Sequence, residues 1–245
     1  MNFENQIVVV TGGTRGIGAG IVTSFLENGG IVIATYAGNN EKAQSFKNTL
    51  GELGEKLALK AFDVSKKAEV DDFWSWLDEN FGAPDILVNN AGIRQDQILA
   101  SMEEDMWDRV LDVNLKGTML MSQGAVLKMM KKRYGRIINM SSIGGALGLA
   151  GQANYAASKA GQVALAKTLS KEVAKRGITV NCILPGFIET ELIADLPAEQ
   201  VIEYKKTVPL KRFGTVKEVA HAVMFLADKN SSYITGTTLE VAGGL

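Results

Sequence analysis

Short apolar runs, spaced regularly along the 245 residues, constrain the fold of this chain more than any other feature. The runs are rich in β-branched residues and nearly continuous in apolar character, instead of alternating with polar residues. This pattern is typical of strands that are buried on both faces of a parallel sheet. The runs cover residues 7–11, 31–36, 57–63, 86–89, 136–140, 179–184 and 238–241.

Amphipathic segments with helical spacing separate these runs. They cover residues 17–28, 41–53, 66–81, 104–132, 155–176 and 217–228. Because strands and helices alternate, the sequence predicts an α/β fold: a Rossmann-type doubly wound parallel sheet of about seven strands with helices on both faces. No linker or repeat interrupts the pattern, so we interpret residues 1–245 as a single domain.

One long segment, within about residues 186–215, breaks this alternation. Together with Pro185, which precedes it, the segment holds three of the four prolines of the chain, and it is too long for an ordinary connection. Long ordered loops often act as lids, and ligands of doubly wound sheets bind outside the carboxyl ends of the strands. We therefore expect this segment to cover a binding site.

A glycine-rich turn follows the first run directly. In TGGTRGIG, Gly12, Gly16 and Gly18 lie between the first predicted strand and the first predicted helix. Glycine permits a tight turn there and lets a pyrophosphate approach the N–H groups of a helix N-terminus. This position predicts a dinucleotide site. A second glycine-rich stretch, GGALGLAGQ at 144–152, has no clear helix start after it and is interpreted as a loop near the site.

The residues after the second run favour NADP(H) over NAD(H). An NAD site usually places an acid about 20 residues after the glycine turn, where the acid binds the ribose 2′-hydroxyl. Here the run continues as IATYAGNN, and Glu41 is the first acid to appear. Without a carboxylate a 2′-phosphate is not repelled, and Arg15 could pair with it. The alternative for Arg15 is a solvated surface charge.

The stretch YAASK places Tyr155 and Lys159 on one face of a predicted helix. Free tyrosine has a pKa of about 10, and a nearby ammonium lowers it. The small residues around the pair leave room for a cofactor against the helix. We therefore expect Tyr155 to be an acid–base group with a lowered pKa, although such a pair alone is usually a plain surface pair.

Charge and composition exclude several other classes. The 26 Lys and Arg balance the 27 Asp and Glu, so no global charge selects a nucleic acid or a membrane surface. One cysteine and one histidine exclude a disulfide and a multi-cysteine or histidine-cluster metal site, and we expect no metal. The N-terminus carries no signal-peptide pattern, and no apolar window reaches the ~18 residues that span a bilayer. We therefore expect a cytoplasmic protein.

Several short motifs occur together in one order: TGGTRGIG, NNAG at 89–92, DVNLKG with Asn114, NMSSIGG with Ser142, YAASKAG and PGFIET. In these motifs the chain resembles the short-chain dehydrogenase/reductase family over essentially its whole length. The resemblance implies that Ser142 hydrogen-bonds a substrate carbonyl oxygen and that Tyr155 donates a proton to it. It also implies that Lys159 holds the nicotinamide ribose and that Asn114 anchors a water in a proton relay.

The same resemblance assigns further positions. Asp63 and Val64 would contact adenine, with a helix N-cap as the alternative for Asp63. The cofactor-binding positions that we expect are Gly12, Thr14, Arg15, Gly16, Ile17, Gly18, Tyr36, Asp63, Val64, Asn90, Ala91, Gly92, Tyr155, Lys159, Pro185, Gly186 and Ile188. Substrate contacts are expected from Ser142, Gln152, Tyr155 and Phe187.

Longer stretches, among them KKRYGRIINMSS and VPLKRFG, resemble bacterial members of this family that reduce 3-oxoacyl thioesters in fatty-acid synthesis. The resemblance implies NADPH, a substrate linked to acyl carrier protein or CoA, and a homotetramer joined through helices 104–132 and 155–176. It also implies carrier docking by Arg133 and Arg176 beside the cleft, although cations are favoured at helix C-termini in any case.

Other functions stay open. An acetoacetyl-CoA reductase or another short-chain alcohol dehydrogenase would use the same scaffold. A protein of a different class, a catalytically silent dinucleotide sensor, would not need the catalytic residues.

The sequence departs from the family pattern at two places. Ala242 in EVAGG replaces a common aspartate, and GIRQD at 92–96 has Arg94 and Gln95 where the family usually has GITRD. Both places lie near expected subunit contacts or the cleft, so assembly and substrate choice stay open.

Overall fold

A parallel sheet runs through the whole chain. In the computed structural model, which describes residues 1–191 and 198–245, seven strands form one sheet in the order β3-β2-β1-β4-β5-β6-β7. Their bounds are β1 Ile7–Val10, β2 Ile31–Tyr36, β3 Leu57–Ala61, β4 Ile86–Asn89, β5 Gly135–Met140, β6 Ile178–Pro185 and β7 Thr238–Val241. The order reverses between β1 and β4, which creates the crevice where doubly wound sheets bind ligands.

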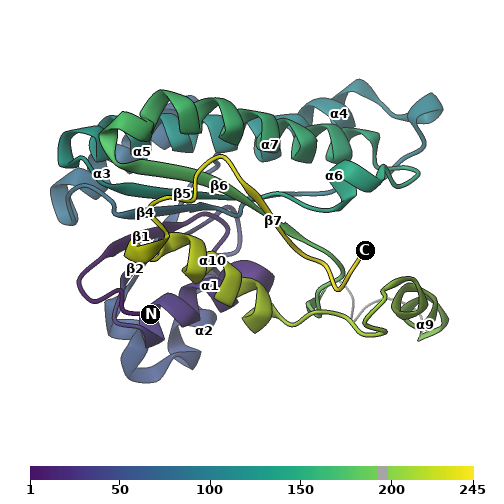
Figure 1. Cartoon of the computed structure of the whole chain (residues 1–245), viewed down its shortest axis with the longest axis horizontal. Helices are drawn as coiled ribbons and strands as arrows, with labels where there is room; N and C mark the ends of the chain where they lie inside the picture. Colours follow the sequence, from purple (N-terminus) through teal and green to yellow (C-terminus); the bar gives the residue numbers. More distant parts are fainter. Residues whose placement is uncertain (192–197) are drawn as a thin grey trace.

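Helices cover both faces of the sheet (Figure 1). One face carries α1 Gly16–Glu27, α2 Asn40–Thr49 and α10 Val216–Ala227, and the other carries α3 Lys67–Asn80, α5 Gly117–Lys132 and α7 Ala153–Val173. The shorter helices are α4 Glu104–Leu111, α6 Gly144–Leu147 and α9 Ala198–Thr207. The predicted doubly wound α/β fold is confirmed.

The strands bury alternate residues in two separate cores. In β1, Val8 and Val10 pack against α1 and α10, whereas Val9 packs against the helices of the opposite face. Since neither face of the central strands meets water, both sets of side chains must be apolar. This double burial explains why the runs show no alternation with polar residues in the sequence.

The predicted helix over residues 104–132 is not continuous. Between α4 and α5 the chain forms a π-helical turn, Asp112–Lys116, which contains the buried Asn114. The extra residue in such a turn shifts the helix face, and π turns often occur at functional sites. The loop predicted at 144–152 begins with the single turn of α6, and the sequence pattern missed α9.

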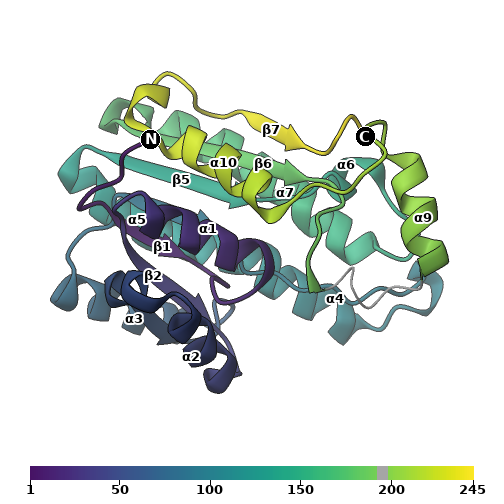
Figure 2. The same cartoon turned by 90° about the horizontal axis from the view of Figure 1, so that it is seen from below.

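The segment predicted as a lid lies beyond the carboxyl ends of the strands, beside α6 and the C-terminus (Figure 2). Residues 192–197 of this segment lie outside the described residues. In the described part, Ile188 forms a β-bridge with Gly214, and the Phe187 ring stacks on Tyr204 of α9 with centroids 4.9 Å apart. These contacts connect the two ends of the segment, and its role as a lid stays a prediction.

Across residues 1–191 and 198–245, no helix combines the length and the apolar character needed to cross a bilayer.

Candidate active site

The glycine turn between β1 and α1 has the backbone geometry that its residues permit. Gly12 and Gly16 have φ angles of 61° and 51°, in the left-handed region that glycine adopts without strain. Gly18 is required for a different reason, because a Cβ atom there would lie 2.2 Å from the Gly12 carbonyl oxygen. The first helical turn therefore packs directly on the loop, and its N–H groups lie close to the turn.

The tips of β1 and β4 are fixed to each other by hydrogen bonds. The Thr11 hydroxyl accepts hydrogen bonds from the backbone N–H groups of Asn90 and Ala91, at 2.9 and 3.0 Å. In return, the Asn90 side-chain amide donates to the carbonyl oxygens of Thr11 and Gly12, at 3.0 and 2.9 Å. These contacts place the expected cofactor residues 90–92 beside the glycine turn, across the crevice of the sheet.

The start of α1 suits an anion. Its first turn contains no acidic residue, and its N-cap residue, Arg15, is exposed and makes no side-chain capping bond. Thr14 and Ile17 are half-buried on either side of Gly16. A helix N-terminus with free N–H groups and a nearby guanidinium fits a pyrophosphate or phosphate group. The residues present therefore fit a dinucleotide.

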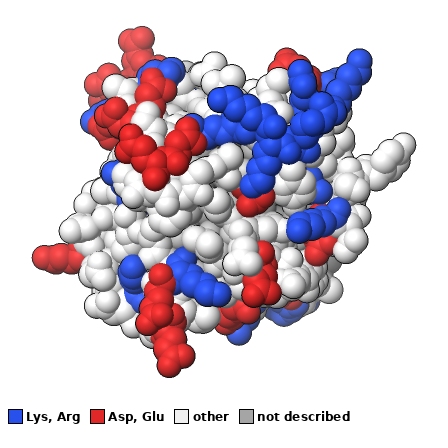
Figure 3. Space-filling view, turned by 90° about the vertical axis from the view of Figure 1, so that its left-hand side faces the viewer, with Lys and Arg blue, Asp and Glu red and all other residues white. Residues whose placement is uncertain are grey.

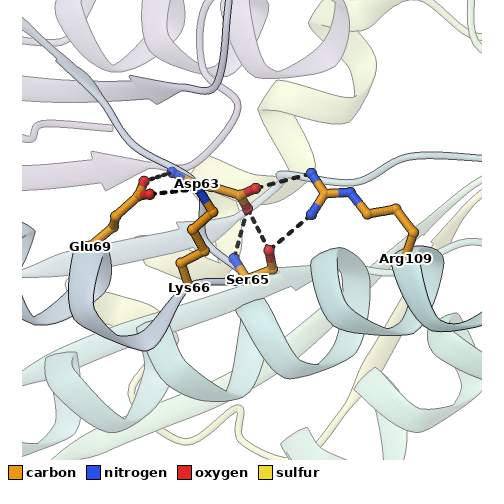
Figure 4. A network of polar contacts seen from close by, with 5 residues as sticks. All are labelled: Asp63, Ser65, Lys66, Glu69 and Arg109. Carbon is orange, nitrogen blue, oxygen red and sulfur yellow. Dashed lines mark hydrogen bonds and ion pairs between the residues drawn. The ribbon is translucent and has the colours of Figure 1, made fainter. Parts of the chain in front are cut away.

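Asp63 follows β3 and has a fixed carboxylate. Its Oδ1 accepts hydrogen bonds from the backbone N–H and the hydroxyl of Ser65, at 2.9 and 2.7 Å, and its Oδ2 pairs with Arg109 Nη2 at 3.0 Å (Figure 4). Burial raises the pKa of Asp63, but the hydrogen bonds from Ser65 and Arg109 outweigh burial and hold the pKa below its ordinary value.

Asp63 is therefore an ionised acceptor held in place by Arg109 of α4. The alternative role of Asp63 as an N-cap is wrong, because the N-cap residue of α3 is Lys66. Val64 is buried beside Asp63 and packs against the start of α5, where a Cβ atom on Gly117 would lie 2.7 Å from it.

Three of the expected substrate-binding side chains surround Gly144. A Cβ atom on this glycine would lie 3.3 Å from Ser142 Oγ, 3.6 Å from Tyr155 Cε1 and 3.7 Å from Gln152 Oε1. Gly144 also donates its N–H to Ser142 Oγ at 3.0 Å, which orients the hydroxyl. Hence the tip of β5, the turn of α6 and the start of α7 bring these groups together around one small space.

Lys159 and Asn114 meet under Gly92. A Cβ atom on Gly92 would lie 3.3 Å from Asn114 Oδ1 and 3.5 Å from Lys159 Nζ. The Lys159 ammonium is buried, donates to the Met140 carbonyl oxygen at 2.7 Å, and lies 5.6 Å from the centre of the Tyr155 ring. The four residues expected to be catalytic therefore lie in one cluster.

Asn114 holds the neighbouring loop and helix in place. Its side-chain amide donates to the Ile93 carbonyl oxygen and to Ser158 Oγ, at 3.0 and 3.1 Å, and its Oδ1 accepts from the Ile93 N–H at 2.8 Å. Since Ser158 precedes Lys159, Asn114 fixes the helix that carries the ammonium. The water that Asn114 is expected to anchor stays a prediction.

The expected fall of the Tyr155 pKa is wrong for the chain itself. Burial raises the pKa of Tyr155 above its ordinary value, although a hydrogen bond with Ser142 and the nearby Arg94 charge act in the opposite direction. Burial also lowers the pKa of Lys159 to about 8. The same low-dielectric environment thus disfavours both charged forms, and Lys159 hydrogen-bonds Met140 instead of the phenol.

The other expected positions surround this cluster or the cofactor crevice. Tyr36 ends β2, and its hydroxyl donates to Asn40 Oδ1. Pro185 ends β6. Gly186 packs closely on Ala242, the residue that replaces the common aspartate of the family, and a Cβ atom on Gly186 would lie 2.8 Å from the Ala242 Cα. Ile188 is buried where the segment re-joins Gly214.

Arg133 and Arg176 do not lie beside this site in the same chain. Arg133 follows α5, Arg176 follows α7, and Arg133 Nη2 donates to the Lys175 carbonyl oxygen at 3.2 Å. Tyr155 lies at the opposite end of α7, whose 21 residues span about 30 Å. Figure 3 shows basic side chains gathered on the face that holds these helix ends. The expectation that both arginines lie beside the cleft is therefore wrong for a single subunit.

Sequence reasoning missed Gln162, which is fully buried under the cluster. Its side-chain amide donates to the Asn114 carbonyl oxygen and to Thr118 Oγ1, at 2.6 and 2.8 Å, and its Oε1 lies 3.4 Å from Lys159 Nζ. Gln162 follows Tyr155 by seven positions, so the two share a helix face. The available signal was a glutamine on the helix face that carries Tyr155 and Lys159.

The glycine turn on the first strand, the crevice between β1 and β4, and the serine, tyrosine and lysine beside it define a dinucleotide-binding α/β oxidoreductase. The match of residues 12–245 to a family model described as "Enoyl-(Acyl carrier protein) reductase" agrees with this class. The chain belongs to the short-chain dehydrogenase/reductase family. Membership implies a nicotinamide dinucleotide cofactor.

Curated relatives match the chain over nearly its full length. The 3-oxoacyl-[acyl-carrier-protein] reductase of Escherichia coli strain K12 is 43% identical over 245 residues, which are 100% of this chain and 99% of the relative. The enzyme of the same name from Vibrio harveyi is 44% identical with the same coverage. That from Haemophilus influenzae is 43% identical over 243 residues, 99% of each chain.

Proposed function

We propose that the chain reduces 3-oxoacyl thioesters carried by acyl carrier protein to 3-hydroxyacyl thioesters, with NADPH as the reductant, in fatty-acid synthesis. The observation that carries this proposal is the cluster of Ser142, Tyr155 and Gln152 around Gly144, at the carboxyl ends of the strands. The curated relatives support the choice of substrate, since they bear the name of this activity at about 43% identity.

The chemistry needs a proton donor and a charge-stabilising donor at the ketone oxygen. Ser142 hydrogen-bonds this oxygen where negative charge develops, and Tyr155 transfers its phenolic proton to it. Because burial raises the pKa of Tyr155, the phenol keeps its proton at neutral pH, as a donor in the reductive direction must. The nicotinamide cofactor, when bound, supplies the hydride.

Lys159 and Asn114 assist this step by binding the cofactor ribose and by holding the neighbouring backbone in place. The Lys159 ammonium would hold the ribose of the cofactor, and with a pKa of about 8 it can release and regain a proton near neutral pH. Asn114 keeps Ser158 and the Ile93 backbone in place around it. The residues that would hold the rest of the cofactor are the glycine turn, Asp63 and the 90–92 strand tip.

The preference for NADPH rests on the region after β2. Tyr36 is followed by no acid until Glu41 in the first turn of α2, and Arg15 is exposed at the N-terminus of α1. We expect Arg15→Gln to weaken NADPH binding by about tenfold and to leave NADH binding within about twofold, since only the 2′-phosphate needs the guanidinium. Fluorescence titration with both dinucleotides measures this, and equal losses for both would contradict the assignment.

Carrier docking by Arg133 and Arg176 requires a second subunit, because both lie about 30 Å from Tyr155 of their own chain. The proposed homotetramer would have to bring this basic face beside a cleft of its neighbour. We expect Arg133→Glu with Arg176→Glu to lower kcat/KM for the carrier-linked substrate by about tenfold or more, and to leave a small thioester mimic unaffected. Equal effects on both substrates would argue against docking at these residues.

One assay separates the proposed activity from the other activities that this scaffold could support. Oxidation of NADPH and of NADH is followed with 3-oxoacyl acyl carrier protein, acetoacetyl-CoA, a trans-2-enoyl thioester and an unrelated cyclic ketone. The proposal predicts the highest kcat/KM for the carrier-linked 3-oxo substrate with NADPH. A higher value for the CoA ester identifies an acetoacetyl-CoA reductase, a higher value for the cyclic ketone another alcohol dehydrogenase, and no turnover with any substrate a silent dinucleotide sensor.

A further inference from the structure

A cationic side chain lies directly over the catalytic tyrosine. The guanidinium carbon of Arg94 is 5.8 Å from the centre of the Tyr155 ring. Arg94 follows Gly92 at the tip of β4, and 49% of its side chain is exposed. Any compound that places a carbonyl at the Tyr155 hydroxyl therefore has a guanidinium within reach of its neighbouring atoms.

Arg94 is held in a defined position by its own loop. Its Nε donates to Asp96 Oδ1 at 3.2 Å, and its Nη2 pairs with Asp96 Oδ2. Asp96 Oδ2 also accepts a hydrogen bond at 3.1 Å from the amide of Gln152, a buried residue of the cluster around Gly144. The guanidinium is thus connected to the substrate side of the site through two side chains.

Backbone contacts fix the same loop to the start of α7. Gln97 donates its N–H to the Gly151 carbonyl oxygen at 2.8 Å, and the Asn154 side chain donates to the Gln95 carbonyl oxygen at 3.0 Å. Asn154 directly precedes Tyr155 in the chain. The loop that carries Arg94 and the helix that carries Tyr155 therefore keep one relative geometry, which a binding residue requires.

The Arg94 guanidinium keeps donors for a ligand. Its planar group has five N–H donors, and Asp96 occupies only Nε and one N–H of Nη2. Within residues 1–191 and 198–245, Nη1 of Arg94 donates no hydrogen bond.

We propose that Arg94 is a specificity-determining residue that donates hydrogen bonds to the thioester carbonyl oxygen of the substrate, two carbons from the ketone. This inference rests on the proposed function and deepens it. In a 3-oxoacyl thioester only two C–C bonds of about 1.5 Å separate the two carbonyl carbons, so the second oxygen lies within a few ångströms of the first. A guanidinium beside Tyr155 can reach that oxygen while Tyr155 contacts the ketone.

The hydrogen bond from Arg94 discriminates against ketones that lack the second carbonyl oxygen. A site built to hydrogen-bond a substrate oxygen discriminates strongly against an analogue without that oxygen, because the donor is then desolvated without a partner. Arg94 therefore favours β-dicarbonyl compounds over simple ketones of the same size. The same donors suit the carboxylate of a free 3-oxo acid, which carries oxygens at the same position.

The test compares two ketones that differ only at this position. One is the N-acetylcysteamine thioester of 3-oxobutanoate, and the other is the corresponding thioether, in which a CH₂ group replaces the thioester carbonyl. For the wild type and for Arg94→Met, kcat/KM is measured for the thioester, and the thioether is measured as a competitive inhibitor of thioester reduction. We expect Arg94→Met to lower kcat/KM for the thioester about tenfold to a hundredfold, and to leave the thioether inhibition constant unchanged or to lower it.

A second variant separates donation from loop geometry. Arg94→Met leaves Asp96 without its partner, whereas Arg94→Met combined with Asp96→Asn removes that unpaired charge. If Arg94 acts by donation, the double variant stays as impaired on the thioester as the single one. Recovery by the double variant, or equal losses on thioester and thioether, would overturn the inference. Failure of the wild type to reduce the thioester would instead refute the proposed function.

Discussion

We expect Tyr155→Phe to lower kcat/KM for a 3-oxoacyl thioester by about a thousandfold or more, while NADPH binding stays within about twofold of the wild type. The substitution removes one hydroxyl and keeps the ring that packs near Gly144 and Lys159. General acid catalysis contributes about 10²–10⁴-fold. The Lys159 ammonium is not placed to replace the phenol, because it donates to the Met140 carbonyl oxygen and lies 5.6 Å from the centre of the Tyr155 ring. Stopped-flow measurement of NADPH oxidation and a fluorescence titration separate the two effects.

Tyr233→Phe is the matched control for this experiment. Tyr233 is fully exposed in the turn before β7, so the same loss of a hydroxyl should change neither turnover nor binding. If Tyr155→Phe keeps more than about a tenth of the wild-type activity, the proton must come from another donor. The assignment of Tyr155 as the general acid would then be wrong.

The second large effect is expected from Lys159→Met, which should lower activity and at the same time stabilise the fold. Burial of the ammonium depresses its pKa from 10.5 to about 8, which corresponds to roughly 3 kcal/mol of unfavourable free energy at neutral pH. Methionine fills a similar volume without this cost, although the Met140 carbonyl oxygen and Gln162 lose a donor. We expect a net gain of about 1–2 kcal/mol in unfolding free energy at pH 7.

The lowered pKa of Lys159 determines how the unfolding free energy changes with pH. Below pH 8 both the folded and the unfolded chain bind the Lys159 proton, and the folded chain carries the full cost of burying the charge. Between pH 8 and 10.5 only the unfolded chain keeps the proton, so the stability contributed by Lys159 rises with pH. The advantage of Lys159→Met should therefore be largest at pH 7 and shrink toward pH 10.

Thermal or urea denaturation of both proteins across this pH range measures the difference. Lys171→Met, on the exposed side of the same helix, controls for the loss of an ordinary lysine and should show no such pH dependence. A variant that is less stable than the wild type at pH 7 would show that the ammonium stabilises the folded chain. Turnover of Lys159→Met should fall at least tenfold in either case, because the ribose loses its partner.

The sequence predicted the fold and most of the candidate site, because both depend on local patterns. Residues 7–11 and 31–36 reveal doubly buried strands by composition alone, and Tyr155 with Lys159 is visible as an i,i+4 pair. The boundary at Ala61 was missed by two residues, since Phe62 and Val64 are apolar but pack in a loop against α3 and α5.

Features that depend on tertiary packing were beyond the sequence. The π turn around Asn114 carries no composition signal, because its residues also suit an α-helix. The direction of the Tyr155 pKa was wrong because spacing shows that Lys159 is near, whereas burial decides whether either group ionises. The expectation that Arg133 and Arg176 lie beside the cleft is a different kind of error, because their distance from Tyr155 follows from the length of the predicted helix 155–176 and does not depend on tertiary packing.

Reciprocal hydrogen bonds join Thr11 to residues 90–91 and hold the tips of β1 and β4 together. The amide protons of Asn90 and Ala91 are protected from exchange with deuterium while their hydrogen bonds to the Thr11 hydroxyl hold. Exchange at these two amides therefore reports the opening of the contact between the tips of β1 and β4. If the amides of α9 exchange faster than these two amides, α9 opens locally while the tips of β1 and β4 stay joined.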